Sequence, residues 1–499
     1  MPRLTSSFDA DDPVAARLWV ARDDLVAEEP AGDGVFVGRD GPVRAYRRTV
    51  ERSSDGRIVS TVTYRLAIPW FGWVFALPLR RALRRPPLPD GRRPWWAARD
   101  RLDGRQVQVL GLLAAASLVV GYVNTLFTQT VALAAEEFDV GEAAQGVAGT
   151  VVRAGIVLVL PLLFLADRVG RRRVALGCAF AAPVLTALGA LAPSFWVLTA
   201  TQTVSRPLGL ALDVLIAVMA AEEMPRDSRA YAVSLLSMST GLGAGMAVAA
   251  LPLGDLGVGG WRLVYVLALV LLVVVADLAR RLPETTRFVA TERAPRSPID
   301  RRRLLFLAST AFLGNLFVAP ASFFQNRYLQ DVRGFSAGMV SLFTLATGTP
   351  AGLGVIAGGR LADTWGRRIV GVIGITGGVS LLVTSFFVDG WLMWVSAAAA
   401  GVFGGIAVPS LTVYRAELFP TTARSGGGGL VTASALLGGG IGLLGVGALV
   451  DAGSGYGPAI GATAIGQAFV ILLLLTRFPE TAHRELEELN PGRAPSPPS

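Results

Sequence analysis

The chain is dominated by long apolar runs separated by short polar segments. A helix needs roughly 20 mostly apolar residues to cross the hydrocarbon core of a bilayer, and twelve runs match that length. They cover residues 108–134, 145–166, 174–193, 195–220, 230–252, 260–279, 303–327, 337–358, 369–388, 391–413, 426–450 and 458–476. The pattern therefore predicts an all-α membrane protein with twelve transmembrane helices.

The region before the first run follows a different pattern. Apolar and polar residues alternate on both sides of Asp55-Gly56, which predicts a β-hairpin with these residues in its turn. An aromatic stretch at 68–78 is too short to span a bilayer and is followed by a basic cluster at 80–85. Such a segment suits the surface of an anionic leaflet. The alternative is a small packed domain with these aromatic residues in its core.

Three motifs occur twice, in the same order and about 196 residues apart. The pairs are Leu165-Ala-Asp-Arg-Val-Gly-Arg-Arg172 with Leu361-Ala-Asp-Thr-Trp-Gly-Arg-Arg368, Glu222-x2-Pro225-x3-Arg229 with Glu417-x2-Pro420-x3-Arg424, and Pro283-Glu-Thr285 with Pro479-Glu-Thr481. Repeats of this length between apolar runs indicate two related bundles of membrane helices. The expected organisation is an N-terminal extension at 1–105, bundles at 106–281 and 303–478, a linker at 282–302 and a tail at 479–499.

The composition removes several classes of function. Of 499 residues, 52% are hydrophobic, and the chain has one cysteine, one histidine and no lysine. Cys178 lies in an apolar run and His483 in the tail, so an intrachain disulfide, a histidine-based triad and a histidine-ligated metal inside the bundles are excluded. A phosphate-binding loop with its lysine is absent, and no nucleophile–base pair converges. We expect neither an enzyme nor a bound cofactor or metal.

Positive charge is distributed unevenly along the chain. The net charge is +9, and 41 of the 46 basic residues fall on one face when alternate loops are assigned to opposite sides of a membrane. Arginine-rich loops remain in the cytoplasm during insertion. This pattern predicts a multi-pass protein of the plasma (inner) membrane with both termini in the cytoplasm. Because topology accounts for the charge, we expect no nucleic-acid partner.

The repeated loop motif resembles the major facilitator superfamily signature Gly-x-Leu-Ala-Asp-Arg-x-Gly-Arg-Arg, within a resemblance that covers about residues 105–489. The second copy keeps the leading glycine as Gly359, whereas Leu163 replaces it in the first. The resemblance implies two six-helix bundles with a substrate site between them and motif residues that hold the cytoplasmic side shut. These gating residues would be Asp167, Gly170, Arg171, Glu222, Arg229, Asp363, Gly366, Arg367, Glu417 and Arg424. In such a loop arginines anchor the chain at the surface, glycine permits a sharp reversal, and aspartate can cap a helix of the opposite half.

Within that superfamily, several helix exits resemble those of sugar porters. Pro283-Glu-Thr-Thr-Arg287-Phe288 follows the sixth run, and Pro479-Glu-Thr481 follows the twelfth. The family's sugar-binding signatures in the seventh and tenth helices are missing. The first run reads Gly121-Tyr122-Val123-Asn124 where the family has Gly-Tyr-Asp. The resemblance therefore implies a sugar-porter-like frame, whereas the departures argue against a hexose and against the usual proton-coupling aspartate.

Ionisable side chains inside membrane spans mark candidate pathways, because placing them in lipid is costly. Arg153 lies in the second run. Arg206 and Asp213 share one face of the fourth, about 10 Å apart along a helix. We assign substrate binding to the two arginines and proton coupling to Asp213; snorkelling or structural pairing is the alternative. Further polar residues expected at the same cavity are Asn124, Gln129, Asn315, Gln325 and Asn326, each of which could instead join helices.

These features together predict a secondary active transporter of a small polar or anionic organic metabolite, working by alternating access and coupled to protons. The expected partners are a small-molecule substrate, membrane lipid and the proton gradient, and the expected state is a monomer. Two alternatives stay open: a multidrug or toxic-compound exporter of the same fold, and a transporter-derived membrane sensor or scaffold. The direction of transport is not determined by these patterns.

Overall fold

The computed structural model describes residues 2–13, 15–88, 91, 93–94, 96–140, 142–287, 300–335, 337–420 and 424–489. Among these residues, twelve helices are long and apolar enough to cross a membrane, as the apolar runs predict. The chain separates into two compact units. The N-terminal unit comprises Met1–Ala115 with Glu223–Ser228, and the membrane unit comprises Ala116–Glu222 with Arg229–Ser499.

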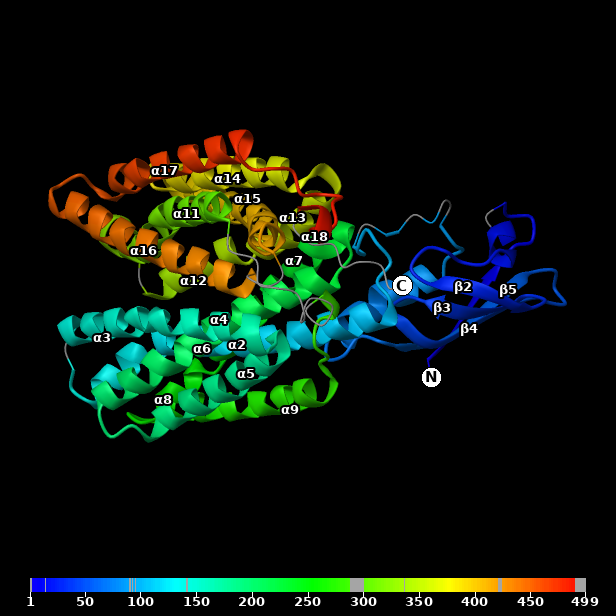
Figure 1. The fold of residues 1–499 in the computed structure, drawn as a ribbon, viewed down its shortest axis with the longest axis horizontal. Helices are drawn as coiled ribbons and strands as arrows, with labels where there is room; N and C mark the ends of the chain where they lie inside the picture. The colour runs from blue at the N-terminus through cyan, green and yellow to red at the C-terminus, as the bar shows by residue number, and fades with distance from the viewer. Residues whose placement is uncertain are drawn as a thin grey trace. The chain divides into compact units, whose positions relative to one another are not determined.

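The N-terminal unit is built on a five-stranded antiparallel sheet with the strand order β1-β5-β4-β3-β2 (Figure 1). Its strands are β1 (Arg3–Phe8), β2 (Ala27–Gly32), β3 (Val35–Asp40), β4 (Val43–Arg52) and β5 (Ile58–Leu66). Arg52 of β4 pairs with Ile58 of β5, so Asp55 and Gly56 lie in the turn, as the alternating pattern predicts. Helix α1 (Gly72–Leu83) follows the sheet.

Two alternatives were considered for the segment that forms α1: a membrane-surface segment and part of a packed domain. The helix has features of both. Leu79 and Leu83 are buried in a core shared with Val62 and Tyr64 of β5, so the helix packs on the sheet. Neither of its aromatic residues, Trp73 and Phe75, belongs to that core, and 76% of Trp73 is exposed. The segment is therefore part of a packed unit, yet Trp73 faces outward.

A buried ion pair crosses the interior of this unit. Arg48 donates from Nε to Glu28 Oε1 at 2.8 Å and from Nη2 to Oε2 at 2.6 Å, and Tyr46 Oη donates to the same carboxylate at 2.6 Å. Burial raises the pKa of Glu28. The hydrogen bonds and the charge of Arg48 together lower it by more, so the pKa of Glu28 lies below its ordinary value. The remaining Arg48 N–H groups bind the carbonyl oxygens of Leu18 and Val20.

Replacing Arg48 with methionine is expected to destabilise the N-terminal unit by about 3–5 kcal/mol, because the Glu28 carboxylate would stay buried without its cation. The matched control is Arg39→Met, which removes an ion pair to Glu29 between side chains that are 63% and 55% exposed. That change should cost at most about 1 kcal/mol. Hydrogen exchange of the β4 and β5 amides in the full chain would measure both. Equal protection in the two variants would contradict the prediction.

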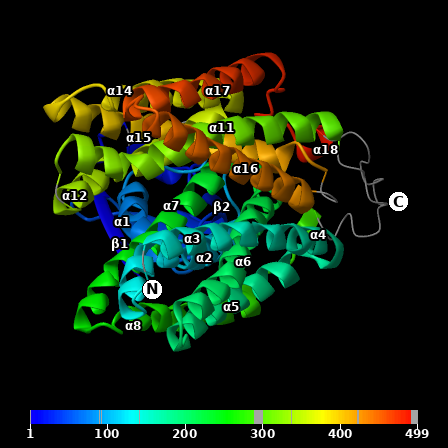
Figure 2. The ribbon, with the colours of Figure 1, turned by 90° about the vertical axis from the view of Figure 1, so that its left-hand side faces the viewer.

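The membrane unit contains two bundles, each of which supplies six membrane-crossing helices. The N-terminal bundle consists of α2 (Gly104–Glu137), α3 (Glu142–Ala154), α4 (Val159–Val169), α5 (Arg171–Leu188), α6 (Phe195–Glu223), α7 (Arg229–Ala249), α8 (Trp261–Val266) and α9 (Leu272–Arg281). The C-terminal bundle consists of α11 (Arg301–Arg327), α12 (Ala337–Gly348), α13 (Ala351–Trp365), α14 (Arg367–Ser385), α15 (Gly390–Glu417), α16 (Arg424–Asp451) and α17 (Tyr456–Thr476), and α18 (Leu486–Leu489) follows. Figures 1 and 2 show α11, α14, α15, α16 and α17 on one side and α3, α5, α6 and α8 on the other.

The two bundles repeat the same helix packing. In the first, a Cβ added at Gly243 of α7 would overlap the carbonyl oxygen of Leu118 on α2. In the second, a Cβ added at Gly438 of α16 would overlap the carbonyl oxygen of Phe312 on α11. Glycine at these positions allows the backbones to approach closely, as is common for helices in lipid. The sequence repeat therefore corresponds to a structural repeat.

Two of the expected spans are interrupted at symmetry-related places. The second span divides into α3 and α4 through a 3₁₀ segment, Gly155–Leu158. The eighth divides into α12 and α13 at a two-residue break that ends with Pro350. Pro161 in the first turn of α4 and Pro350 before α13 lack the N–H that a continuous α-helix would use, so the helical hydrogen bonding changes there.

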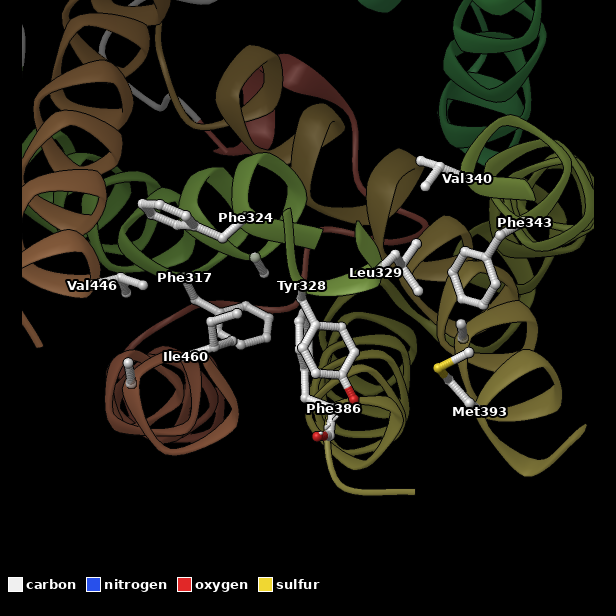
Figure 3. Close-up of a cluster of buried hydrophobic side chains, with 13 residues drawn as sticks. Phe317, Phe324, Tyr328, Leu329, Val340, Phe343, Phe386, Met393, Val446 and Ile460 are labelled. Carbon is white, nitrogen blue, oxygen red and sulfur yellow. Dashed lines mark hydrogen bonds between the residues drawn. The ribbon is translucent and has the colours of Figure 1, made fainter. Parts of the chain in front are cut away.

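The C-terminal bundle has a large aromatic and aliphatic core at the end away from the repeated motifs (Figure 3). The Tyr328 and Phe386 rings lie 4.8 Å apart between centroids, and Tyr328 Oη donates to the Phe386 carbonyl at 3.0 Å. Arg333 Nε donates to Tyr328 Oη at 2.7 Å. These contacts join the end of α11 to the end of α14 within one bundle.

Candidate functional site

Asp167, near the end of α4, connects the N-terminal bundle to the C-terminal one. Its carboxylate accepts the backbone N–H of Ser425 at 3.2 Å and that of Gly426 at 2.7 Å. Both donors lie in the first turn of α16, where N–H groups have no partner within the helix and the helix dipole favours a negative charge. Arg171 Nη2 lies 3.1 Å from Asp167 Oδ1 and holds the carboxylate in place.

Asp363, near the end of α13, makes the same connection in the opposite direction. Its two oxygens accept the backbone N–H groups of Ala230 at 3.3 Å and Tyr231 at 2.9 Å, at the start of α7. Arg367 Nη2 lies 3.0 Å from Asp363 Oδ1. Each bundle therefore places one aspartate on a helix N-terminus of the other. We call this end of the membrane unit, where α4, α6, α13 and α15 end, the arginine-rich end.

A buried ion-pair cluster accompanies the first of these caps. Glu222, at the end of α6, lies 2.6 Å from Arg424 Nη1 of the other bundle and 3.5 Å from Arg171 Nη2 of its own. Thr285 Oγ1 donates to Glu222 Oε2 at 2.6 Å. All four residues are at most 1% exposed, so this polar cluster is shielded from water and screening is weak.

An equivalent cluster accompanies the second cap. Glu417, at the end of α15, lies 3.2 Å from Arg229 Nη1 of the other bundle and 3.2 Å from Arg367 Nη2 of its own. Arg229 also contacts Glu485, 3.4 Å from its Nη2. The structure thus brings the charged residues predicted to gate the protein together at one end, in two symmetric sets that join the bundles.

The two motif glycines have backbone conformations that other residues rarely adopt. The φ angles of Gly170 and Gly366 are 110° and 105°, and each residue separates two helices. A Cβ on Gly366 would lie 2.6 Å from Glu480 Oε2. That carboxylate accepts the N–H of Arg367 at 2.9 Å and caps α14. Glu284 caps α5 in the same way. The glutamates of the two Pro-Glu-Thr motifs are therefore helix caps, a role that the sequence pattern did not predict.

The two predicted cavity arginines interact across neighbouring helices. Arg153 and Arg206 interact electrostatically, and the helices that carry them touch nearby. Gly155 fits against Thr203 of α6, and a Cβ on it would lie 3.2 Å from Pro207 Cγ. Arg206 is half-buried and Arg153 is exposed.

Asn124 is the polar residue of the first span that packs against this region. A Cβ on Gly209 of α6 would lie 2.8 Å from Asn124 Oδ1. That oxygen is buried and accepts no hydrogen bond from the described residues, so it is available to a donor on a ligand. Gln129, further along α2, is exposed.

Asp213 interacts with a charged residue that the sequence pattern did not single out. The charged side chain that acts on Asp213 is Arg415 of α15, in the other bundle, rather than Arg206 on its own helix. Neither Asp213 nor Arg415 has an ion pair within 4.0 Å among the described residues. The apolar run predicts a span that ends at 413, which leaves Arg415 in the following loop. In the structure, α15 continues to Glu417 and includes Arg415. The shared site of Arg206 and Asp213 stays a prediction, and Arg415 is a charged residue that the sequence pattern did not single out.

Arg415 also lines a cavity of about 370 Å³ inside the C-terminal bundle, with Tyr414 and Gln467 among its polar residues. The walls are otherwise mostly apolar and come from α11, α14, α15 and α17. Gln467 Nε2 is already used, since it donates to the Gly314 carbonyl at 2.8 Å. This cavity lies within one bundle and is distinct from the site between bundles that the family resemblance implies.

The polar residues predicted on the seventh span have different roles. Asn315 Nδ2 donates to the Ala435 carbonyl at 2.8 Å, which joins α11 to α16 and matches the structural alternative for this residue. Gln325 is half-buried. The side chain of Asn326 lies outside the described residues.

The sequence matches a known family model over most of the chain. The model of the Major Facilitator Superfamily matches residues 113–349 and 307–498. The chain belongs to the major facilitator superfamily. This superfamily consists of membrane transporters, which are non-enzymatic carriers.

Curated superfamily relatives match part of the chain. An uncharacterized MFS-type transporter of Bacillus subtilis, YtbD, is 24% identical over 52% of this chain and 66% of its own length. A gentisate transporter of Corynebacterium glutamicum is 25% identical over 53% of this chain and 64% of its own. A probable chloroplastic anion transporter of Arabidopsis thaliana is 32% identical over 21% of this chain and 20% of its own. The chain thus spans less than two thirds of these relatives.

Solved superfamily structures share the fold over nearly their whole length. The proton:xylose symporter XylE aligns with a TM-score of 0.66 and 16% identity, over 78% of this chain and 98% of that one. The human organic anion transporter MFSD10 aligns with a TM-score of 0.63 and 15% identity, over 74% and 99%. FucP in the outward conformation aligns with a TM-score of 0.63 and 15% identity, over 75% and 100%.

Proposed function

We propose that the protein is a proton-coupled secondary active transporter that moves a small polar or anionic organic metabolite across the plasma membrane by alternating access. The observation that carries this proposal is the pair Arg153 and Arg206, which the folding of α6 against the second span brings together. Ionisable side chains in membrane spans are costly and are usually retained for a pathway. Two neighbouring guanidinium groups form a site for an anion.

Charge favours an anionic substrate over a cationic one. Interactions between charges are much stronger in a low-dielectric cavity than in water, so two arginines attract anions and repel cations. The planar fork of arginine binds both oxygens of a carboxylate. Two relatives are named as transporters of gentisate and of anions, which supports the same class. The buried oxygen of Asn124 would accept a hydrogen bond from a substrate hydroxyl.

The arginine-rich end is proposed to be the cytoplasmic end, because loops rich in arginine remain on that side. The helix caps and ion pairs there then close the cytoplasmic gate, so this structure corresponds to the state closed toward the cytoplasm. Alternating access requires that these contacts break and reform. The gating residues of both bundles, the plasma-membrane location with cytoplasmic termini and the monomeric state are parts of the same proposal.

Substitution of Arg206 tests the substrate class. Arg206→Lys keeps the charge but loses the planar fork, and we expect it to weaken binding of an organic anion roughly 10- to 100-fold, as for loss of a charged hydrogen bond. Purified protein would be screened by thermal shift against organic anions, neutral polyols and organic cations. Arg281→Gln, at a 46% exposed side chain on α9, is the matched control and should leave the profile unchanged.

The same screen separates the proposal from its alternatives. Stabilisation by organic cations alone, unaffected by Arg206→Gln, would contradict the anion site and favour an exporter of lipophilic compounds. Ligand stabilisation without any transport into proteoliposomes would favour a sensor or scaffold. Stabilisation by anions that Arg206→Gln abolishes supports the proposed transporter.

A further inference from the structure

Helix α1 of the N-terminal unit exposes an apolar stripe on the side opposite its core contacts. The stripe consists of Trp70, Trp73, Val74 and Leu77, which are 40%, 76%, 43% and 57% exposed. The buried face of the helix carries Leu79 and Leu83, which pack on the sheet. The stripe is therefore separate from the core of the unit, because α1 contributes to that core through its opposite face.

The exposed side of α1 becomes basic in its second half. Trp73, Leu77, Arg80 and Arg84 follow one another at intervals of four, three and four residues, which places them on one side of the helix. Exposed arginines continue at the C-terminal end of the helix, at positions 80, 81, 84 and 85. One face thus combines large apolar side chains with four positive charges.

Contacts inside the N-terminal unit place the start of α1 beside the first membrane-crossing helix. Pro69 packs on Gly111 of α2, where an added Cβ would lie 2.6 Å from Pro69 Cδ. The span on α2 begins at Gly104, so Gly111 lies about 10 Å along the helix from that end. Arg44 of β4 also donates to Gln108 of α2. The stripe therefore begins beside the first two turns of the helix that carries the first membrane span.

The orientation of α1 is held by the rest of the unit. Arg22 donates to the carbonyl oxygens of Ala82 and Arg85 at the end of the helix, which satisfies groups that lack helical partners. Trp70 has a φ of 61°, a conformation that is rare for an aromatic residue. Tertiary contacts, rather than the preference of Trp70 itself, keep the stripe directed outward.

We propose that α1 docks on the anionic lipid headgroups of the bilayer in which the chain is embedded. The apolar stripe inserts at the boundary of the acyl chains, and the arginines bind the phosphate groups. Charge complementarity selects this partner, because a second copy of the chain would bring four more arginines against the same face. The inference requires only that the chain spans a membrane and is independent of which substrate it carries.

A spin-label experiment on the full chain tests the proposal. Cys178 is the single cysteine, so Cys178→Ala with Val74→Cys provides one labelling site beside the intact Trp73 and Leu77. The labelled protein is placed in nanodiscs of phosphatidylcholine with or without phosphatidylglycerol, and collisions with oxygen and with a water-soluble nickel complex are measured. We expect the label to meet oxygen and to be protected from nickel when phosphatidylglycerol is present, and to be less protected without it.

The reference position is Ser54→Cys in the hairpin turn, at the far end of β5, which spans nine residues or roughly 30 Å. This label should meet nickel in both lipids. Arg80→Gln with Arg84→Gln should reduce the ratio of docked to free α1 roughly 25-fold, since each basic residue near an anionic surface contributes roughly fivefold. Arg52→Gln with Arg57→Gln is the matched control and should change nothing. A Val74 label open to nickel in both lipids, or shielded from both reagents by protein, would overturn the proposal.

Discussion

The substitution Asp363→Asn is expected to lower transport strongly and to open the arginine-rich end. Asp363 accepts two backbone N–H groups of α7 and pairs with Arg367, and each hydrogen bond to a charged group contributes about 1.5–3 kcal/mol. Loss of about 2 kcal/mol shifts the ratio of closed to open states roughly 30-fold. Uptake into proteoliposomes measures the functional effect. Labelling of Ser234→Cys in a Cys178→Ala background measures opening, because Ser234 of α7 is buried against Gly359 of α13.

The matched control for this change is Asp277→Asn. Asp277 and Arg281 form an ion pair with the same spacing of four residues on α9, but both side chains are partly exposed and lie in one bundle. Exposed pairs of this kind contribute about 0–1 kcal/mol, so transport and Ser234→Cys labelling should remain normal. If Asp363→Asn also transports normally and leaves labelling unchanged, the assignment of the gate is wrong.

The substitution Asp213→Asn is expected to abolish proton-driven accumulation of substrate. Exchange of substrate across the membrane should remain intact. Asp213 on α6 interacts with Arg415 on α15, so one bundle contributes the carboxylate and the other the guanidinium. Protonation of Asp213 would remove this attraction between the bundles, and release of the proton would restore the attraction. A proton on this carboxylate can therefore bias which way the bundles close, because a ligand shifts a conformational equilibrium by its difference in affinity for the two states.

Two transport assays on one preparation test this coupling. Uptake driven by an imposed proton gradient should disappear in Asp213→Asn, whereas counterflow between equilibrated compartments should persist. Asp213→Glu keeps a titratable group and should retain part of the accumulation. Full proton-driven accumulation by Asp213→Asn would rule this residue out and indicate facilitated diffusion or another proton carrier.

The membrane architecture could be predicted from the sequence because lipid leaves the chain few options. Every span must satisfy its own backbone hydrogen bonds and expose apolar side chains, so length and hydropathy identify the twelve helices. The repeated motifs predicted two related bundles, and Gly243 and Gly438 show the repeat at the level of backbone contacts. The charged gating residues could be named in advance because aspartate, glycine and arginine have separate physical tasks in a short loop between helices.

The pairings in the candidate site were decided by tertiary structure. Helical spacing placed Arg206 and Asp213 on one face, but it carries no information about which residue of another bundle lies opposite. In the folded chain, Arg206 interacts electrostatically with Arg153, and Asp213 with Arg415. The direction of the α1 stripe was decided in the same way, because Leu77 and Leu79 are equally apolar in sequence and only packing on the sheet determines that Leu79 is the buried one. Local pattern thus determined the helices, the repeat and the charged residues of the repeated motifs, whereas contacts between distant segments determined the partners of each charge.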